Sequence, residues 1–222
     1  MDKTIQKILM AGLLFISFGI TNILAQDNFT LINYTPDDGA KIEAALFDAG
    51  MEKAVIFAHG AIFNKESWYF LAGKFQKQGV SSLSIDLRGY GNSTADNLNQ
   101  KYFDILGAIQ FLKEKGIKEI NIIGGSMGGA AILQALSHTQ DPLIKKVVLL
   151  APAGGPPIKS HSIDKLFIIS KQEGLYDRVK SVFNDSASPK DMKEYEGSSH
   201  AQHMFKANYS YELTRLIIDF IE

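Results

Sequence analysis

The 222-residue chain contains no cysteine. Disulfide bonds and attachment of a lipid through a cysteine are therefore excluded. A fold without disulfides must be stabilised by its core alone, and the 45% of hydrophobic residues in a chain of this length is enough for one sizeable core. We therefore expect a single domain from residue 26 to residue 222.

The chain also lacks an excess of charge of either sign. The chain has 23 Lys and Arg residues and 24 Asp and Glu residues, which gives it a formal net charge of −1 at pH 7. Domains that bind nucleic acid commonly carry a basic surface, so we expect no nucleic-acid partner. A small, uncharged molecule is the favoured partner.

The first 25 residues have the pattern of a secretory signal peptide. Lys3 and Lys7 precede a long apolar run, and the small residue Ala25 is followed by the polar Gln26. We expect cleavage there and export to the periplasm or the medium. The alternative is that residues 8–25 remain as a membrane anchor, since they approach the roughly 20 residues needed to span a bilayer. Contact with a membrane is expected only in that case.

A Gly-x-Ser-x-Gly sequence, from Gly124 to Gly128, joins a β-branched apolar run to a helix-forming stretch. A serine at a sharp strand-to-helix turn is strained, and glycines two residues before and after it avoid a clash. The turn lifts the Ser126 hydroxyl clear of the sheet and places the N–H of Met127 where an oxyanion can be held. The main rival is a dinucleotide-binding turn, but that turn needs glycine at position 126, so no cofactor is expected.

Apolar patterning predicts an α/β fold with eight strands separated mostly by helices. The expected strands are Phe29 to Tyr34, Lys41 to Phe47, Ala54 to Ala58, Ser82 to Ile85, Glu119 to Ile123, Val147 to Leu150, Leu166 to Ile169 and Asp191 to Tyr195. The first two are separated by a turn signal and read as an antiparallel hairpin. Alternation of strand and helix thereafter implies a mostly parallel sheet with helices on both faces.

Four motifs occur in an order that resembles the α/β-hydrolase superfamily. They are His59-Gly60, Asp86 to Ser93, the Ser126 turn, and Gly197 to His200. The resemblance covers nearly all of the chain after residue 25 and implies the α/β-hydrolase fold. It also implies a triad in the chain order serine, acid, histidine, with Ser126 as the nucleophile and His200 as the general base.

Two carboxylates compete for the role of the acid. Glu173 lies three residues after Ser170, at the end of a predicted strand, where the family places its acid. Asp177 falls in the first turn of the next helix, where a carboxylate commonly interacts with the helix N-terminus or with water. We favour Glu173 and keep Asp177 as the alternative.

The resemblance also assigns the groups around the reacting atoms. The N–H of Ala61 is the expected second oxyanion donor beside that of Met127, with His59 and Gly60 supporting the loop. Asp86 and Arg88 are expected to brace a loop rather than to react. Trp68 is expected to pack in the core.

The remaining histidines are given no catalytic role. His200 and His203 form a His-x-x-His pair, but no further ligand accompanies them, so no metal is expected. His138 is expected to lie at the C-terminus of a helix, where a histidine is favoured, and His161 is expected to lie in a loop.

The connection from Ala153 to Asp164 is too short for a cap domain. The chain therefore resembles the capless serine-esterase and dienelactone-hydrolase-like branch, although dienelactone hydrolases proper carry cysteine where this chain has Ser126. The expected activity is hydrolysis of a small carboxylic ester through an acyl-enzyme. An amidase, peptidase or acyltransferase with the same triad, and a non-catalytic binding protein with this fold, are the alternatives.

Overall fold

A computed structural model describes residues 28–222 of the chain. The predicted signal peptide of residues 1–25, and the alternative anchor of residues 8–25, lie outside the described residues. Across residues 28–222, none of the helices combines the length and the apolar character that a membrane crossing requires.

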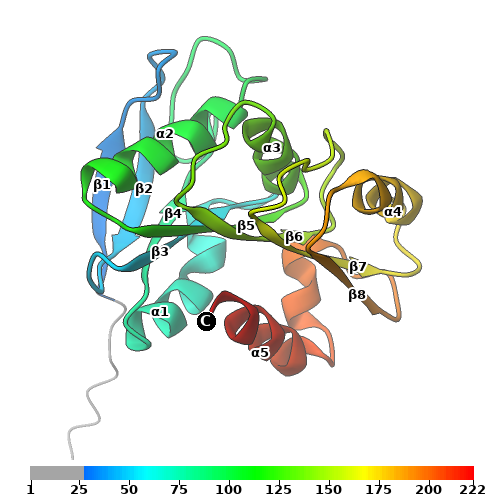
Figure 1. The fold of residues 1–222 in the computed structure, drawn as a ribbon. Coiled ribbons are helices and arrows are strands. Elements are labelled where there is room, and N and C mark those ends of the chain that lie inside the picture. The colour runs from blue at the N-terminus through cyan, green and yellow to red at the C-terminus, as the bar shows by residue number, and fades with distance from the viewer. Residues whose placement is uncertain (1–27) are drawn as a thin grey trace, which may run out of the picture.

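Within residues 28–222, eight strands form one sheet in the order β1-β2-β4-β3-β5-β6-β7-β8 (Figure 1). They are β1 (Thr30–Tyr34), β2 (Ile42–Phe47), β3 (Lys53–Ala58), β4 (Ser81–Ile85), β5 (Glu119–Gly125), β6 (Ile144–Leu150), β7 (Asp164–Ser170) and β8 (Lys190–Tyr195). The pairs β1·β2 and β2·β4 are antiparallel and the other five are parallel. The predicted mostly parallel sheet with an amino-terminal antiparallel hairpin is confirmed.

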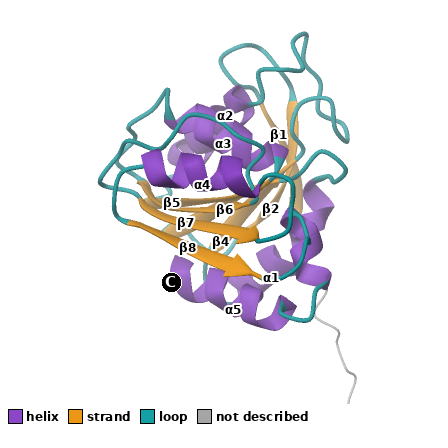
Figure 2. Ribbon diagram, turned by 90° about the vertical axis from the view of Figure 1, so that its right-hand side faces the viewer, coloured by secondary structure: helices purple, strands orange, loops and turns teal. Residues whose placement is uncertain are grey.

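In the described part of the chain, five α-helices cover the two faces of the sheet. They are α1 (Tyr69–Lys77), α2 (Tyr102–Glu114), α3 (Met127–Leu136), α4 (Tyr176–Asp185) and α5 (Ser210–Ile221). Figures 1 and 2 show α2, α3 and α4 on one face and α1 and α5 on the other. This arrangement follows from parallel strands, whose crossover connections place helices on both sides.

Two short 3₁₀ helices were not predicted, η1 (Lys65–Trp68) and η2 (Ala201–Lys206). Trp68 ends η1 instead of lying within the helix that follows. The side chain of Asn64 accepts the backbone N–H of Glu66, and this local hydrogen bond begins the tighter turn. Trp68 is nevertheless fully buried, with its ring stacked on Phe57 at 5.3 Å between centroids, so its predicted place in the core is correct.

The side chains of the strands point into two apolar cores, one on each face of the sheet. Ile56 and Ile122 belong to the core under α2, α3 and α4, whereas their chain neighbours Phe57 and Ile123 belong to the core under α1 and α5. Side chains alternate between the faces of a strand, so a strand covered on both sides must be apolar throughout. Full burial of each large aliphatic side chain contributes about 1.5 to 3 kcal/mol, which allows the fold to stand without disulfides.

The carboxyl ends of the parallel strands meet at one edge of the sheet. The turns after β3, β5, β7 and β8 therefore lie together there, although they are far apart in the sequence. Residues 151–163, which join β6 to β7, contain no helix or strand, so no cap domain is inserted at this point. Ligands of open α/β sheets bind at this edge.

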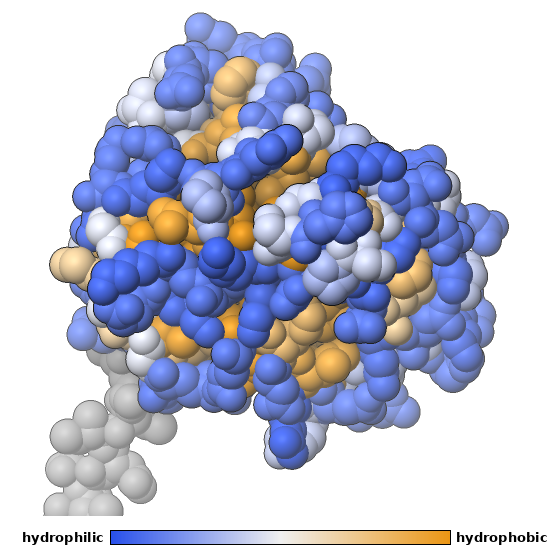
Figure 3. All heavy atoms as spheres, in the orientation of Figure 1, coloured by the Kyte–Doolittle hydropathy of each residue, from blue (hydrophilic) through white to orange (hydrophobic). Residues whose placement is uncertain are grey.

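Figure 3 shows one face of the molecule, in the orientation of Figure 1. Hydrophilic residues cover most of it, and the apolar patches between them are interrupted, including those over α1 and α5. Interrupted patches of this kind are normal on a protein surface and do not identify a binding site.

Candidate active site

Ser126 occupies the turn between β5 and α3 in a backbone conformation that is unusual for a residue with a side chain. Its φ is 49° and its ψ is −115°. The turn is possible because the flanking positions are glycine. A Cβ at Gly124 would lie 2.3 Å from Cδ1 of Ile132, and a Cβ at Gly128 would lie 2.3 Å from the carbonyl oxygen of Ala58. Strain of this kind persists only where the surrounding packing enforces it, and it collects at functional sites.

His200 contacts the hydroxyl that this turn presents. Nε2 of His200 lies 2.8 Å from Oγ of Ser126, across 74 residues of sequence. The imidazole is 37% exposed, so a substrate at this edge of the sheet can reach it. The structure thus brings the predicted nucleophile and the predicted base into hydrogen-bond distance.

Glu173 is the carboxylate that contacts the other nitrogen of His200, with 2.5 Å between Oε2 and Nδ1. Its side chain is only 3% exposed. Because a carboxylate oxygen accepts, Nδ1 of the neutral ring carries the proton and Nε2 accepts from the Ser126 hydroxyl. Asp177 lies exposed in the first turn of α4 and has no hydrogen bond to His200.

Two hydrogen bonds hold the loop of Glu173 against the loop of His200. The Ser170 hydroxyl donates to the carbonyl of Ser199 at 2.6 Å, and the N–H of Gln172 donates to the carbonyl of Gly197 at 2.9 Å. These two hydrogen bonds, one from a side-chain hydroxyl and one from a backbone N–H, fix the two loops relative to each other and so help to set the distance between Glu173 and His200. This is the support that a precise catalytic geometry requires.

The backbone N–H groups of Ala61 and Met127 lie on the two loops that border Ser126. In residues 28–222, neither N–H has a hydrogen-bond acceptor. Met127 is the first residue of α3, whose first N–H groups have no partner within the helix. Both donors are thus available to an incoming oxyanion.

His59 forms hydrogen bonds that hold the loop of Ala61 in place. The N–H of Leu87 donates to its Nε2 at 3.1 Å, so Nδ1 carries the proton and donates to the carbonyl of Gly60 at 2.8 Å. Burial lowers the pKa of His59, which favours the neutral ring that these two bonds need. His59 and Gly60 thus lie beside Ala61, linked to each other and to Leu87 by hydrogen bonds.

Gln202 is a residue at this site that the sequence did not reveal. Its Oε1 accepts the N–H of Gly60 at 3.3 Å, and its Nε2 donates to the hydroxyl of Ser67 at 3.1 Å. It lies two residues after His200 and is buried, so it connects the segment of the base to the loop of Ala61. No local pattern marks such a contact, because Gln202 and Gly60 are 142 residues apart.

Asp86 and Arg88 lie in buried ion clusters beside the site rather than in it. Asp86 accepts from Nζ of Lys65 at 2.7 Å, and Arg88 donates to Asp104 at 2.8 Å. The guanidinium of Arg88 also pairs with Asp38. These contacts fix the loop after β4, which is the bracing role that was predicted.

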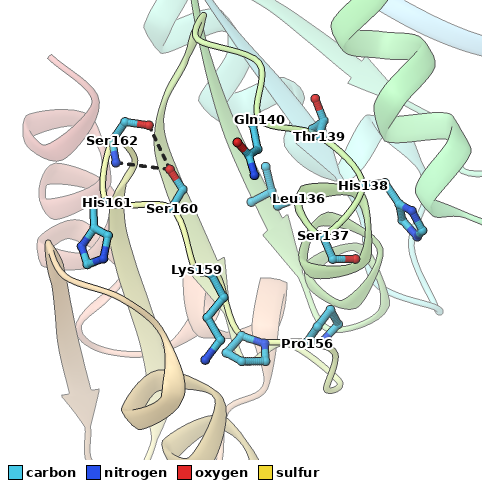
Figure 4. A pocket seen from close by; sticks show the side chains of 11 residues that line it. Leu136, Ser137, His138, Thr139, Gln140, Pro156, Lys159, Ser160, His161 and Ser162 are labelled. Atoms are coloured by element: carbon cyan, nitrogen blue, oxygen red, sulfur yellow. Dashed lines mark hydrogen bonds between the residues drawn. The ribbon is translucent and has the colours of Figure 1, made fainter.

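A hollow of about 760 Å³ lies away from Ser126, between the end of α3 and the loop before β7. Figure 4 shows His138 and His161 on opposite sides of it, with Ser160 and Ser162 hydrogen-bonded to each other. Neither histidine contacts a hydroxyl: His138 bonds the amide of Gln134, and His161 bonds the carbonyl of Ser188. This hollow therefore lacks an activated nucleophile.

Potential metal ligands are also dispersed over the described part of the chain. In residues 28–222, no three His, Cys, Asp or Glu side chains are grouped so that they could hold a metal ion. His203 lies with its ring beside that of Phe63, at 5.2 Å between centroids, and does not join His200 as a ligand pair.

Comparison with known proteins places these residues in a wider family. The model of the family described as "alpha/beta hydrolase fold" matches residues 53–215. The matched range includes Ser126, Glu173 and His200. It begins with the first parallel strand, β3, and leaves out the antiparallel hairpin.

Curated relatives are distant and longer. The AB hydrolase superfamily protein YisY of Bacillus subtilis is 27% identical over 158 residues, which are 64% of this chain and 58% of that protein. The dihydrolipoyllysine-residue acetyltransferase component of the acetoin cleaving system of Cupriavidus necator is 24% identical over 163 residues, which are 72% of this chain and 43% of that protein. The chain thus spans about half the length of these relatives.

Solved structures match the fold over most of both chains. The esterase EaEST from Exiguobacterium antarcticum gives a TM-score of 0.71 at 15% identity, covering 86% of this chain and 99% of the esterase. The esterase Pf2001 from Pyrococcus furiosus gives 0.69 at 18% identity, covering 87% and 89%. At these identities the likeness shows a shared fold.

Proposed function

Because the chain belongs to the alpha/beta-hydrolase fold family, we propose that it is a serine hydrolase that cleaves carboxylic esters through an acyl-enzyme. The observation that carries the proposal is the continuous hydrogen-bonded series Ser126–His200–Glu173, with contacts of 2.8 Å and 2.5 Å. A serine hydroxyl is a poor nucleophile at its own pKa and needs such a base.

In the first half of the reaction, Oγ of Ser126 attacks the ester carbonyl carbon while Nε2 of His200 takes the hydroxyl proton. Glu173 keeps the imidazole oriented and stabilises the imidazolium that forms. When the tetrahedral intermediate collapses, the bond to the alcohol oxygen breaks and His200 gives its proton to that oxygen. The acyl group is left on Ser126.

In the second half, water takes the place of the alcohol. His200 removes a proton from the water as its oxygen attacks the acyl carbon, and the same proton is then returned to Oγ of Ser126. The products are the carboxylic acid and the free enzyme.

The N–H groups of Ala61 and Met127 stabilise the negative charge on the carbonyl oxygen in both halves. They are held in place before the substrate arrives, so no reorganisation is needed as the charge develops. The contacts of Gln202 and His59 to Gly60 support the Ala61 side of this pair.

The test is hydrolysis of 4-nitrophenyl acetate by the purified protein, together with covalent labelling by a fluorophosphonate. Wild-type protein is expected to do both, and Ser126→Ala to do neither. Asp177→Asn is the matched control, because Asp177 is a nearby exposed carboxylate without a contact to His200. Hydrolysis or labelling that persists in Ser126→Ala refutes the assignment.

The same series of residues can serve amide cleavage or transfer of the acyl group to another acceptor, since the acceptor and the pocket decide the product. A panel of matched esters and amides, with and without added alcohol, separates these activities by their products. Tight binding of a small molecule without labelling of Ser126 indicates a binding protein instead.

Export is a separate part of the proposal and is supported by the sequence of residues 1–25. Mass spectrometry of the protein secreted from a suitable host should find an N-terminus at Gln26. A mature chain that still carries residues 8–25 indicates anchoring.

A further inference from the structure

An apolar hollow of about 490 Å³ lies beside the oxyanion loop, between η1 and the start of α1 on one side and η2 on the other. Three aromatic side chains line it, Phe63, Phe70 and Phe205, together with the polar or charged residues Asn64, Glu66, Ser67, Gln202 and Lys206. We call it the phenylalanine hollow. Neither the sequence motifs nor the reaction described above uses it.

Two residues that line the phenylalanine hollow, Phe63 and Gln202, connect it to Gly60 beside the reacting atoms. Gln202 forms part of its wall and bonds the N–H of Gly60. A Cβ placed on Gly60 would lie 3.1 Å from Oε1 of Gln202 and 3.4 Å from Cβ of Ser126. The hollow is therefore next to the position where the ester carbonyl must lie.

The aromatic rings leave apolar surface open at the mouth of this hollow. Phe70 is 42% exposed, although its ring packs edge-on against Phe205 at 5.0 Å between centroids. Ile62, which lies between Ala61 and Phe63 in the chain, is 76% exposed, although it does not line the hollow. Exposed apolar side chains gathered beside a reactive serine fit an apolar ligand better than they fit water.

Two of the polar groups that line the hollow are already paired with each other. The Ser67 hydroxyl donates to the carbonyl of Asn64 at 2.7 Å and accepts from Nε2 of Gln202. The charged residues of the lining, Glu66 and Lys206, are exposed, so their charged ends can stay in water at the rim while an apolar substituent lies against the three rings.

We propose that the phenylalanine hollow is a substrate subsite that takes an apolar group, alkyl or aryl, from one half of the ester. This inference rests on the proposed ester hydrolysis, and it names the class of substrate: esters with an extended apolar substituent rather than short, polar ones. The substituent lies against Phe70 and Phe205 while the carbonyl meets Ser126.

The kinetic test compares two substrate series, 4-nitrophenyl alkanoates from acetate to octanoate and alkyl acetates from methyl to hexyl. Burial of a methylene group is worth about a threefold to fourfold gain in kcat/KM. Wild-type protein should therefore favour the longer substrates of one series by at least about tenfold. Phe70→Ala should remove most of that preference, because it opens the wall that the chain contacts.

Met51→Ala is the matched control. Met51 is 62% exposed, and it lies just before β3, at the opposite edge of the sheet. This substitution should preserve the chain-length preference in full. Equal kcat/KM along both series in the wild type, or an unchanged preference in Phe70→Ala, overturns the subsite while the hydrolase assignment stands.

A binding measurement keeps the subsite testable if no ester is turned over. Hexyl acetate and, separately, methyl octanoate, which carry the apolar chain in the alcohol half and in the acyl half, are titrated calorimetrically into Ser126→Ala, with and without Phe70→Ala. Trp68 is the only tryptophan of the sequence, and its ring centroid lies 5.9 Å from that of Phe205. Its fluorescence therefore gives a second measure of binding beside the calorimetric heat. Binding that Phe70→Ala weakens about tenfold supports the subsite, whereas absent binding or equal binding by both proteins overturns it.

Discussion

Oε2 of Glu173 lies 2.5 Å from Nδ1 of His200, while the other oxygen of the same carboxylate, Oε1, is buried without a hydrogen-bond partner in the described part of the chain. In residues 28–222, the Glu173 carboxylate therefore makes one hydrogen bond, the one to Nδ1 of His200. The position of the carboxylate depends on His200 and on the two hydrogen bonds between their loops.

Glu173→Gln is expected to lower kcat by about 10³-fold to 10⁴-fold, because the amide disfavours the Nδ1–H tautomer and does not stabilise the imidazolium. Asp177→Asn should keep near wild-type kcat. Steady-state hydrolysis of 4-nitrophenyl acetate measures both variants. A large loss in Asp177→Asn with a small loss in Glu173→Gln would show that the acid is Asp177.

Ser126→Gly is expected to be more stable than Ser126→Ala while both lack activity. At φ 49° and ψ −115° an alanine keeps the strain of the serine, whereas glycine adopts this region freely. The difference in free energy of unfolding should be about 1 kcal/mol in favour of glycine. Urea unfolding of both variants measures it, and a glycine variant no more stable than the alanine variant contradicts the strain.

Gly128→Ala is expected to disrupt the turn, because the new Cβ would lie 2.3 Å from the backbone oxygen of Ala58. Backbone atoms cannot move aside cheaply, so several kcal/mol of stability, or the native turn itself, should be lost. Gly174→Ala is the control, since nothing lies within 4 Å of a Cβ at that position. Circular dichroism and thermal unfolding compare the two, and equal stabilities would refute the packing argument.

Gln202→Ala is expected to lower kcat about tenfold with a smaller change in KM, because the loop of Ala61 loses one of its supports and the oxyanion is held less well. Gln202→Glu keeps an acceptor for the N–H of Gly60 and should retain more activity than the alanine variant. The pH profile of kcat should keep its shape in Gln202→Ala, since this change adds no charge and leaves the contacts of His200 in place. Similar losses in kcat for the alanine and glutamate variants would argue against this positioning role.

Stability should fall in mild acid partly because of His59. Its pKa in the folded protein is below its ordinary value of 6.5, mainly through burial. The unfolded chain therefore binds a proton at His59 more readily than the folded protein does. The stability that the neutral His59 ring contributes is present in full above pH 6.5 and declines below it. It is lost as the pH falls through the pKa that His59 has in the folded protein. Urea midpoints between pH 7.5 and 5.5 should show a shallower dependence in His59→Asn than in the wild type. His161→Asn, an exposed control, should retain the wild-type dependence.

The sequence predicts the elements well because most strands are buried on both faces and read as continuous apolar runs. The observed boundaries differ from the predicted ones by a few residues, and β5 runs on through Gly124 and Gly125 to the turn itself. The two 3₁₀ helices escaped prediction because they depend on local contacts such as that of Asn64, not on periodicity.

Around Ser126 the motifs locate the residues that belong to turns at the ends of strands. Ser126, His59 and His200 each follow a recognisable strand, so topology alone brings them to one edge. Spacing from the strand end favoured Glu173 but kept Asp177 as the alternative, because the choice depends on which carboxylate faces His200. Gln202 and the phenylalanine hollow are formed by side chains from distant segments, and no pattern within one segment encodes such contacts.

Strand order also has a consequence for the loss of activity on heating. Ser126 follows β5, a central strand with nearly complete burial, whereas His200 follows β8, the half-exposed last strand of the sheet. Edge segments with fewer buried contacts open at lower free energy than central ones. We expect the base to leave the site before the nucleophile does, so that catalysis fails while most of the protein is still folded and can recover on cooling.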